Sequence, residues 1–272
     1  MSRLQSITQQ ARLDGRKLLI PYLVAGDPDL QITAALMLEL VEQGADVIEL
    51  GIPFSDPASD GPVIQRGVER ALAGKVTLEQ TLDLVAAFRE KNQTTAIVLM
   101  GYLNPIERMG YEAFVVRATE AGVDGVLVVD MPPTESGELH TRLRAANLDT
   151  IYLVAPTTTA ARSAAIVDRC SGYLYYVSLK GVTGAALIDH TSVAAKIAEL
   201  RELTDLPIVI GFGIKDDDSA TAMAKQSDGI IIGSALVERI ARLSAEDASN
   251  AGVLSQTCDI IGSARRALDK IE

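Results

Sequence analysis

An acidic residue interrupts an apolar segment early in the chain. Residues 47–52 read Val-Ile-Glu-Leu-Gly-Ile, a run typical of a strand that is buried on both faces, and Glu49 lies within it. A carboxylate in such a place is poorly solvated, which is costly and raises its pKa. Two interpretations stay open. Either a buried cation pairs with Glu49, or Glu49 moves protons near neutral pH.

Further acids follow this run directly. Pro53 ends the apolar segment, and the loop after it contains Asp56 and Asp60. Acids and glycines at the exit of a strand favour a functional loop, whereas a long loop without them is also found as simple decoration. We therefore expect the site to include groups from this loop.

Short β-branched runs recur along the chain, and each is followed by a helical stretch. The runs cover Leu18–Val24, Val47–Ile52, Ala96–Tyr102, Gly125–Val129, Thr150–Val154, Tyr173–Val177, Pro207–Gly211 and Gly229–Ile232. About eight alternating units in about 250 residues predict a (β/α)8 TIM barrel with extra helices. A doubly wound open sheet is the alternative. It is disfavoured because Gly26 stands alone after the first run and Gly211-Phe-Gly213 lacks a third glycine.

Helix signals support the alternation. After Asp29, apolar residues at helical spacing continue to Gly44, namely Leu30, Ala34, Leu38 and Val41. Thr77 and Gln80 have the spacing of a capping box. These signals predict helices over the segments that follow the first two strands.

Composition limits the remaining possibilities. With 48% hydrophobic and 22% charged residues, the chain is expected to form one domain over residues 1–272. The formal net charge of −11 disfavours nucleic acid, and no run approaches the roughly 18 apolar residues of a membrane span. The start lacks a signal-peptide core, so we expect a cytoplasmic protein. Cys170 and Cys258 have no metal or redox spacing, and His140 and His190 are expected to be solvated bystanders.

Two connections between strands are long. Mid-strand positions Ile48 and Val98 are 50 residues apart, and Tyr175 and Val209 are 34 apart. Loops that leave the C-terminal ends of barrel strands build the active site, so this length predicts lids after the second and sixth strands. The second lid would contain Lys180-Gly-Val-Thr-Gly184.

The last two strands end in small residues. Gly213 follows the seventh strand, and Gly233-Ser234 follows the eighth. Backbone N–H groups there could hold a phosphate, although small residues also ease strand-to-helix packing. Apolar and aromatic residues fall at the other exits, and with a phosphate cradle opposite they predict an aromatic substrate that carries a phosphate. They are Tyr22, Met100, Tyr102, Leu127, Tyr175 and Phe212.

Several motifs in the sequence are similar to those of a known protein family. Two longer motifs are Ile48-Glu-Leu-Gly-Ile-Pro-Phe-Ser-Asp-Pro57 and Asp60-Gly-Pro-Val-Ile-Gln65. Shorter ones are Gly26-Asp-Pro28, Tyr102-Leu-Asn104, Gly181-Val-Thr-Gly184, Gly211-Phe-Gly-Ile214 and Gly233-Ser234. Together they resemble the motifs of the tryptophan synthase alpha subunit family along essentially the whole chain. The resemblance implies a lyase that cleaves indole-3-glycerol phosphate to indole and glyceraldehyde 3-phosphate. It also implies a beta-subunit partner in an alpha2-beta2 heterotetramer, with no metal and no cofactor.

The resemblance also implies roles for residues. Glu49 and Asp60 would be the catalytic pair. Thr183, in the loop after the sixth strand, is predicted to bind the substrate, over the same ligand as Asp60. Gly184, Gly213, Gly233 and Ser234 would hold the phosphate, and the apolar and aromatic set above would surround the indole ring and propanol chain. Asp56 and Asn104 would contact the partner.

The chain departs from the family pattern at three places, and three functions are compatible with its sequence. Ala58, Ser59 and Leu179-Lys180 differ from the usual family pattern, and these differences affect the packing of both lids and leave the catalytic pair intact. The functions are the partnered lyase, a free-standing lyase with the same chemistry, and a non-catalytic regulatory barrel. Intact Glu49 and Asp60 disfavour the third.

Overall fold

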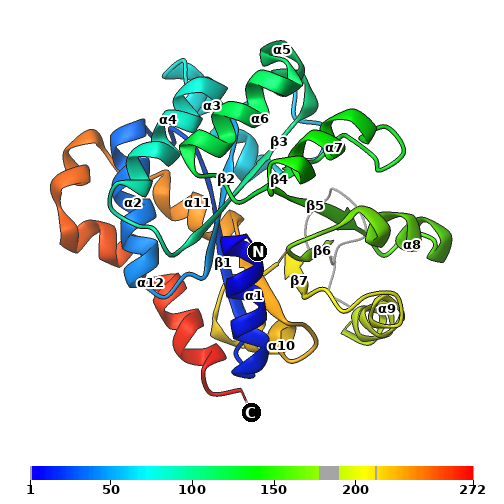
Figure 1. Cartoon of the computed structure of the whole chain (residues 1–272). Helices are drawn as coiled ribbons and strands as arrows, with labels where there is room; N and C mark the ends of the chain where they lie inside the picture. The colour runs from blue at the N-terminus through cyan, green and yellow to red at the C-terminus, as the bar shows by residue number, and fades with distance from the viewer. Residues whose placement is uncertain (1, 178–189, 212, 272) are drawn as a thin grey trace.

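Eight parallel strands close into a barrel in the computed structural model, which describes residues 2–177, 190–211 and 213–271. Each strand pairs with its neighbours in sequence, and β1 pairs with β8 to close the ring (Figure 1). The predicted (β/α)8 TIM barrel is confirmed. The strands are β1 (Leu18–Val24), β2 (Val47–Gly51), β3 (Ala96–Gly101), β4 (Gly125–Val128), β5 (Asp149–Val154), β6 (Leu174–Val177), β7 (Ile208–Gly211) and β8 (Gly229–Ile232).

Helices surround this barrel, and several are additional to the one-per-strand pattern. The helices are α1 (Arg3–Leu13), α2 (Leu30–Glu42), α3 (Pro62–Ala73), α4 (Leu78–Arg89), α5 (Leu103–Met109), α6 (Tyr111–Ala121), α7 (Gly137–Ala145), α8 (Ala160–Arg169), α9 (His190–Arg201), α10 (Asp217–Ala224), α11 (Ser234–Ile240), the 3-10 helix η1 (Ala245–Ser249) and α12 (Ala251–Leu268). Asp29 caps α2 and Thr77 with Gln80 forms the capping box of α4, as predicted.

The stripe predicted for α2 is only half-buried. Leu30, Ala34, Leu38 and Val41 pack at the margin of the core, whereas the fully buried face carries Ile32, Leu36, Met37 and Leu40. The helix is apolar over much of its circumference, so its spacing fits two stripes. In the folded chain the stripe that contains Leu36 and Leu40 packs against the barrel.

The long connection after β2 is mostly helix. Two helices, α3 and α4, occupy most of it, and the non-helical loop is limited to residues 52–61. The predicted lid at this position is therefore shorter than the spacing alone suggested. The predicted lid after β6 falls on residues 178–189, outside the described residues.

The core has two layers. Residues that point outward from the strands pack against the helices, and residues that point inward fill the barrel with side chains such as Ile20, Val98 and Val209. Helix α1 crosses the N-terminal end of the barrel, where Leu4 joins the interior layer (Figure 1). The N-terminal end is thus closed, and the C-terminal end is where the inner layer leads to the loops.

The prediction for His140 was wrong. Its side chain is only 9% exposed, because α7 turns it toward β5, where Nδ1 is 3.4 Å from the Thr150 hydroxyl. Burial lowers the pKa of the imidazole. Cys170 and Cys258 are both free, with Cys258 fully buried. Among the described residues no helix is long and apolar enough to cross a membrane.

Candidate active site

Glu49 points into the barrel from the middle of β2. Its side chain is completely buried, and Oε1 accepts a hydrogen bond of 2.5 Å from the Tyr173 hydroxyl. The other oxygen, Oε2, has no hydrogen-bond partner within the described residues. Burial raises the pKa of Glu49 to about 7, although the Tyr173 hydrogen bond opposes the rise. The sequence left open a buried cation paired with Glu49, but no cation contacts Glu49 among the described residues. The raised pKa suits the carboxyl to proton transfer near neutral pH.

Asp60 lies in the loop after β2 and is half-buried. Burial raises the pKa of this carboxyl as well, and a hydrogen bond from the Tyr102 hydroxyl to Oδ2, at 3.1 Å, lowers it. The same hydroxyl accepts the Ser59 N–H at 3.0 Å, and the Gln65 side-chain amide donates to the Asp60 carbonyl at 2.8 Å. Asp60 is therefore held on one side by Tyr102, the N-cap of α5, and on the other side by Gln65 of α3.

Two tyrosines join the acids into one site. Tyr22 on β1 and Tyr175 on β6 both lie in the inner layer. Burial raises the pKa of each hydroxyl well above its ordinary value, and the charges of both Asp60 and Glu49 raise it further. Because each hydroxyl interacts electrostatically with both carboxyls, the four groups share the C-terminal end of the barrel.

Glycines make room for these two rings. A Cβ at Gly51 would come within 2.3 Å of the Tyr22 hydroxyl oxygen, and one at Gly211 within 2.1 Å of the Tyr175 hydroxyl oxygen. Both distances are below any real Cβ contact, so a side chain at either position would displace a tyrosine. The period of two along the strands puts each glycine on the inner face next to the ring that it admits.

The predicted lining residues are brought together where the structure describes them. Leu127 is buried and Met100 half-buried in the inner layer, and the Tyr102 ring contacts Phe54 with 5.4 Å between centroids. Phe212, Thr183 and Gly184 lie outside the described residues.

The predicted phosphate residues lie after the last two strands. Gly213 has a φ of +75°, which a residue with a side chain rarely adopts. Gly233 is the N-cap of α11, and Ser234 is exposed in its first turn. These backbone groups are at the same end of the barrel as Asp60. Asp56 and Asn104, which were predicted to face a partner, are exposed on the loop after β2 and at the start of α5.

Sequence reasoning missed Tyr173, which is the residue in contact with Glu49. Tyr173 is two positions before Tyr175, so both rings face the barrel interior. That periodicity was the available signal. The hydroxyl of Tyr173 has its pKa raised well above the ordinary value, first by burial and then by Glu49. No group of three or more His, Cys, Asp or Glu side chains that could hold a metal occurs among the described residues.

Comparisons with known proteins agree with this geometry. The sequence model of a family described as Tryptophan synthase alpha chain matches residues 8–264. The chain is 54% identical to the tryptophan synthase alpha chain of Methylococcus capsulatus over 269 residues, covering 99% of this chain and 100% of the relative. It is similar to the crystal structure of tryptophan synthase subunit alpha from Legionella pneumophila, with a TM-score of 0.88, 40% identity and full coverage of both chains. A chain of the tryptophan synthase from M. tuberculosis in its aminoacrylate-bound form gives a TM-score of 0.86 at 32% identity, covering 98% of this chain and 100% of that one.

Proposed function

The chain belongs to the tryptophan synthase alpha chain family, and from this premise we propose that it cleaves indole-3-glycerol phosphate to indole and glyceraldehyde 3-phosphate through Glu49 and Asp60. The reaction is a retro-aldol cleavage in tryptophan biosynthesis. The observation that carries the proposal is Glu49: a buried carboxyl with a pKa of about 7, and with one oxygen that has no partner among the described residues.

The bond that breaks joins a ring carbon to an alcohol carbon. Such a bond breaks readily only after the ring carbon is protonated, because indole then leaves as a neutral molecule. Glu49 is protonated in much of the population near neutral pH, so it delivers this proton. The electron pair of the carbon–carbon bond goes to the ring, the alcohol becomes the aldehyde, and its hydroxyl proton returns to Glu49.

Asp60 performs a different task. It stays ionised, accepts a hydrogen bond from the ring N–H and stabilises the positive charge that develops on the protonated ring. Its hydrogen bond from Tyr102 supports this role, because that bond favours the ionised form. Two carboxyls in settings of different burial thus act as proton donor and as charge stabiliser.

The remaining groups bind the substrate. Tyr22, Met100, Tyr102, Leu127, Tyr175 and Phe212 surround the indole ring and propanol chain. Gly184, Gly213, Gly233 and Ser234 hold the phosphate, and Thr183 contacts the same ligand as Asp60. The exposed position of Ser234 and the positive φ of Gly213 support a phosphate at this rim.

The proposal includes a partner. A beta subunit receives the indole, in an alpha2-beta2 heterotetramer, and Asp56 and Asn104 lie at the contact. Their exposure next to the candidate active site supports this placement. The whole chain, residues 1–272, acts as one domain in this assembly.

The test is indole release from indole-3-glycerol phosphate by the purified chain, alone and after addition of a beta subunit. We expect slow release alone and much faster release with the partner, because partner contacts order the loops over the site. Equal rates would identify a free-standing lyase. No release in either condition would contradict the enzymatic proposal.

A further inference from the structure

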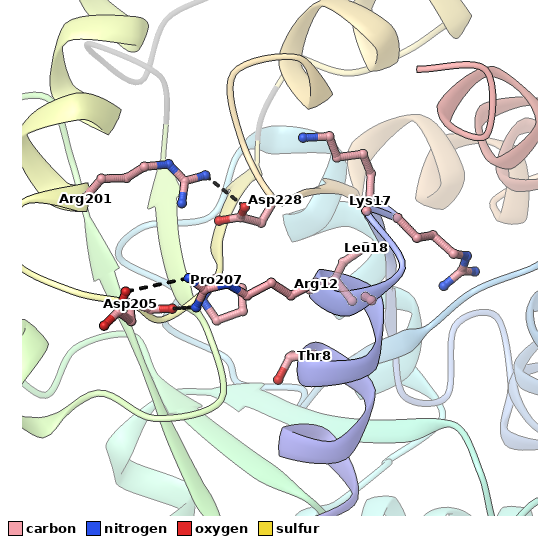
Figure 2. Close-up of a pocket in the computed structure, with 11 residues that line it drawn as sticks. Thr8, Arg12, Lys17, Leu18, Arg201, Asp205, Pro207 and Asp228 are labelled. Carbon is pink, nitrogen blue, oxygen red and sulfur yellow. Dashed lines mark hydrogen bonds and ion pairs between the residues drawn. The ribbon is translucent and has the colours of Figure 1, made fainter. Parts of the chain in front are cut away.

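A charged cavity lies at the opposite end of the barrel from Glu49 and Asp60. It is walled by the second half of α1, the turn over residues 14–17, the last residue of α9 and the residues that precede β7 and β8 (Figure 2). Its volume is about 120 Å³. Since these segments lead into strands, the cavity opens at the N-terminal end of the barrel, where the site proposed above contributes no group.

Cations outnumber acids around this cavity. Its charged side chains are Arg12, Arg16, Lys17 and Arg201 against Asp205 and Asp228. The whole chain has the reverse balance, with 25 Lys and Arg against 36 Asp and Glu. Arg16 is partnered by Asp46, so the cavity itself depends on the other three cations.

The two acids balance these three cations incompletely. Both Asp228 oxygens are occupied, one by Arg201 at 2.8 Å and the other by the Ile208 N–H at 2.8 Å. Asp205 is 3.7 Å from the Arg12 guanidinium, and its side chain is 99% exposed, so this pair contributes little (Figure 2). Arg12 is therefore held in place mainly by its hydrogen bond to the Asp205 carbonyl, at 3.0 Å.

Lys17 is the least exposed of these three cations. Its ammonium donates to the Ser227 carbonyl at 2.7 Å and is half-buried. Burial lowers the pKa of Lys17, Asp228 raises it in part, and the nearby Arg201 lowers it again. The ammonium is thus desolvated beside another cation, and an anion would stabilise its charged form.

We propose that this cavity binds a phosphate group through Arg12, Lys17 and Arg201. Three cations supplied by separate segments suit a tetrahedral dianion, whose oxygens point in several directions, better than a single planar carboxylate. Such a ligand joins α1 to the end of α9 and so ties the helix that closes the barrel to the barrel wall. Occupancy therefore stabilises the folded chain.

The experiment is a titration of the full-length chain with inorganic phosphate at constant ionic strength, followed by amide NMR signals. Gly15 and Leu18 report on the cavity, and Gly233 and Ser234 report on the phosphate residues proposed at the other end. Sodium acetate and sodium chloride are the control titrants. We expect saturable shifts at Gly15 and Leu18 with phosphate alone.

Variants decide which residues bind. Lys17→Gln and Arg12→Gln are each expected to weaken phosphate binding at Gly15 and Leu18 about tenfold or more, because each removes a charge-assisted hydrogen bond. Lys91→Gln, which removes an exposed charge elsewhere, leaves binding unchanged. The inference is overturned if Gly15 and Leu18 do not respond, if chloride or acetate produces the same shifts, or if Lys17→Gln and Arg12→Gln both bind as the parent does. The response of Gly233 and Ser234 tests the active-site phosphate separately.

Discussion

The Tyr173 hydroxyl donates a 2.5 Å hydrogen bond to Oε1 of Glu49 in the closed interior of the barrel. The bond occupies one carboxylate oxygen and leaves Oε2 for other contacts. It favours the ionised carboxylate, while burial favours the neutral acid and dominates. The outcome is a pKa of about 7, so small changes at Tyr173 shift the protonation of Glu49 at physiological pH.

The first prediction concerns the proton itself. Glu49→Gln keeps the side-chain volume but cannot transfer a proton, so we expect indole release to fall about 100- to 10,000-fold. Steady-state assays and circular dichroism on the purified variant measure activity and fold. The exposed Glu120→Gln is the control and keeps parental activity. Near-parental turnover by Glu49→Gln would remove Glu49 from the mechanism.

The second prediction is that Glu49 destabilises the fold at alkaline pH. Its pKa is higher in the folded state than in the unfolded state, so its contribution is most favourable below pH 4.5 and is lost as the pH rises through about 7. The shift corresponds to at most about 3 kcal/mol. We therefore expect the unfolding free energy of Glu49→Gln, relative to that of the parent, to increase as the pH rises from about 5 to about 8.5. Urea unfolding of both proteins at several pH values in this range measures the difference. A pH-independent difference would contradict the raised pKa.

The third prediction uses the Tyr173 hydroxyl. Tyr173→Phe removes the hydrogen bond that lowers the pKa of Glu49, so this pKa rises above about 7. The alkaline limb of the pH profile of kcat/KM should move upward by about one unit, the size expected for a hydrogen bond to a charged group.

Tyr176→Phe is a closely matched control for this change. The Tyr176 side chain is also fully buried, but it faces the helix layer and its hydroxyl has no hydrogen-bond partner within the described residues. We expect its pH profile to match the parent. An unshifted limb in Tyr173→Phe would show that another group titrates there.

The fourth prediction concerns the anchoring of Asp60. Tyr102→Phe retains the ring that contacts Phe54 but removes the hydroxyl that joins Asp60 to the Ser59 N–H. A hydrogen bond to a charged group contributes about 1.5–3 kcal/mol, so we expect kcat/KM to fall about 10- to 100-fold. Tyr111→Phe removes an exposed tyrosine–glutamate hydrogen bond of similar length and should leave kcat/KM unchanged. Equal kinetics in both variants would reduce Tyr102 to a packing residue.

Residues within one strand were the most predictable part of the site. Glu49 was identified because a carboxyl in an apolar β-run has few structural explanations, and Tyr175 because it is an aromatic residue near the exit of such a run. Tyr173 has the same facing as Tyr175, yet sequence gives no sign that its hydroxyl reaches across the barrel to a residue 124 positions earlier. The contact depends on barrel closure, which brings β2 and β6 to opposite walls of one interior.

Helix faces and loops were less predictable. In α2 two apolar stripes compete, and only packing on the barrel separates Leu36 from Leu38. His140 has polar neighbours in sequence, but the rotation of α7 turns it inward. The hydrogen bond from Tyr102 to Asp60 joins residues 42 positions apart. Asp60 lies in an irregular loop, where no periodicity in the sequence predicts which way a side chain points.

The last prediction concerns the loop after β1. Arg70 on α3 forms a bidentate ion pair with Asp27, in which Nε donates to Oδ1 at 2.6 Å and Nη2 donates to Oδ2 at 2.8 Å. The Asp27 side chain is only 1% exposed. Arg70→Met leaves a buried carboxylate without its cation, which costs about 3 kcal/mol of unfolding free energy at neutral pH.

The pH dependence of this loss distinguishes the cause. Burial raises the pKa of Asp27 and Arg70 opposes the rise, so removal of Arg70 raises this pKa further. The neutral acid needs no cation, and the destabilisation should therefore shrink as the pH falls toward the raised pKa. Urea unfolding of Arg70→Met at several pH values measures it, with Arg142→Met as the control because Arg142 pairs with exposed glutamates. Adding Asp27→Asn to Arg70→Met should recover part of the loss at neutral pH. If the double variant is as unstable as Arg70→Met, the cost comes from lost packing of α3 and not from the uncompensated charge.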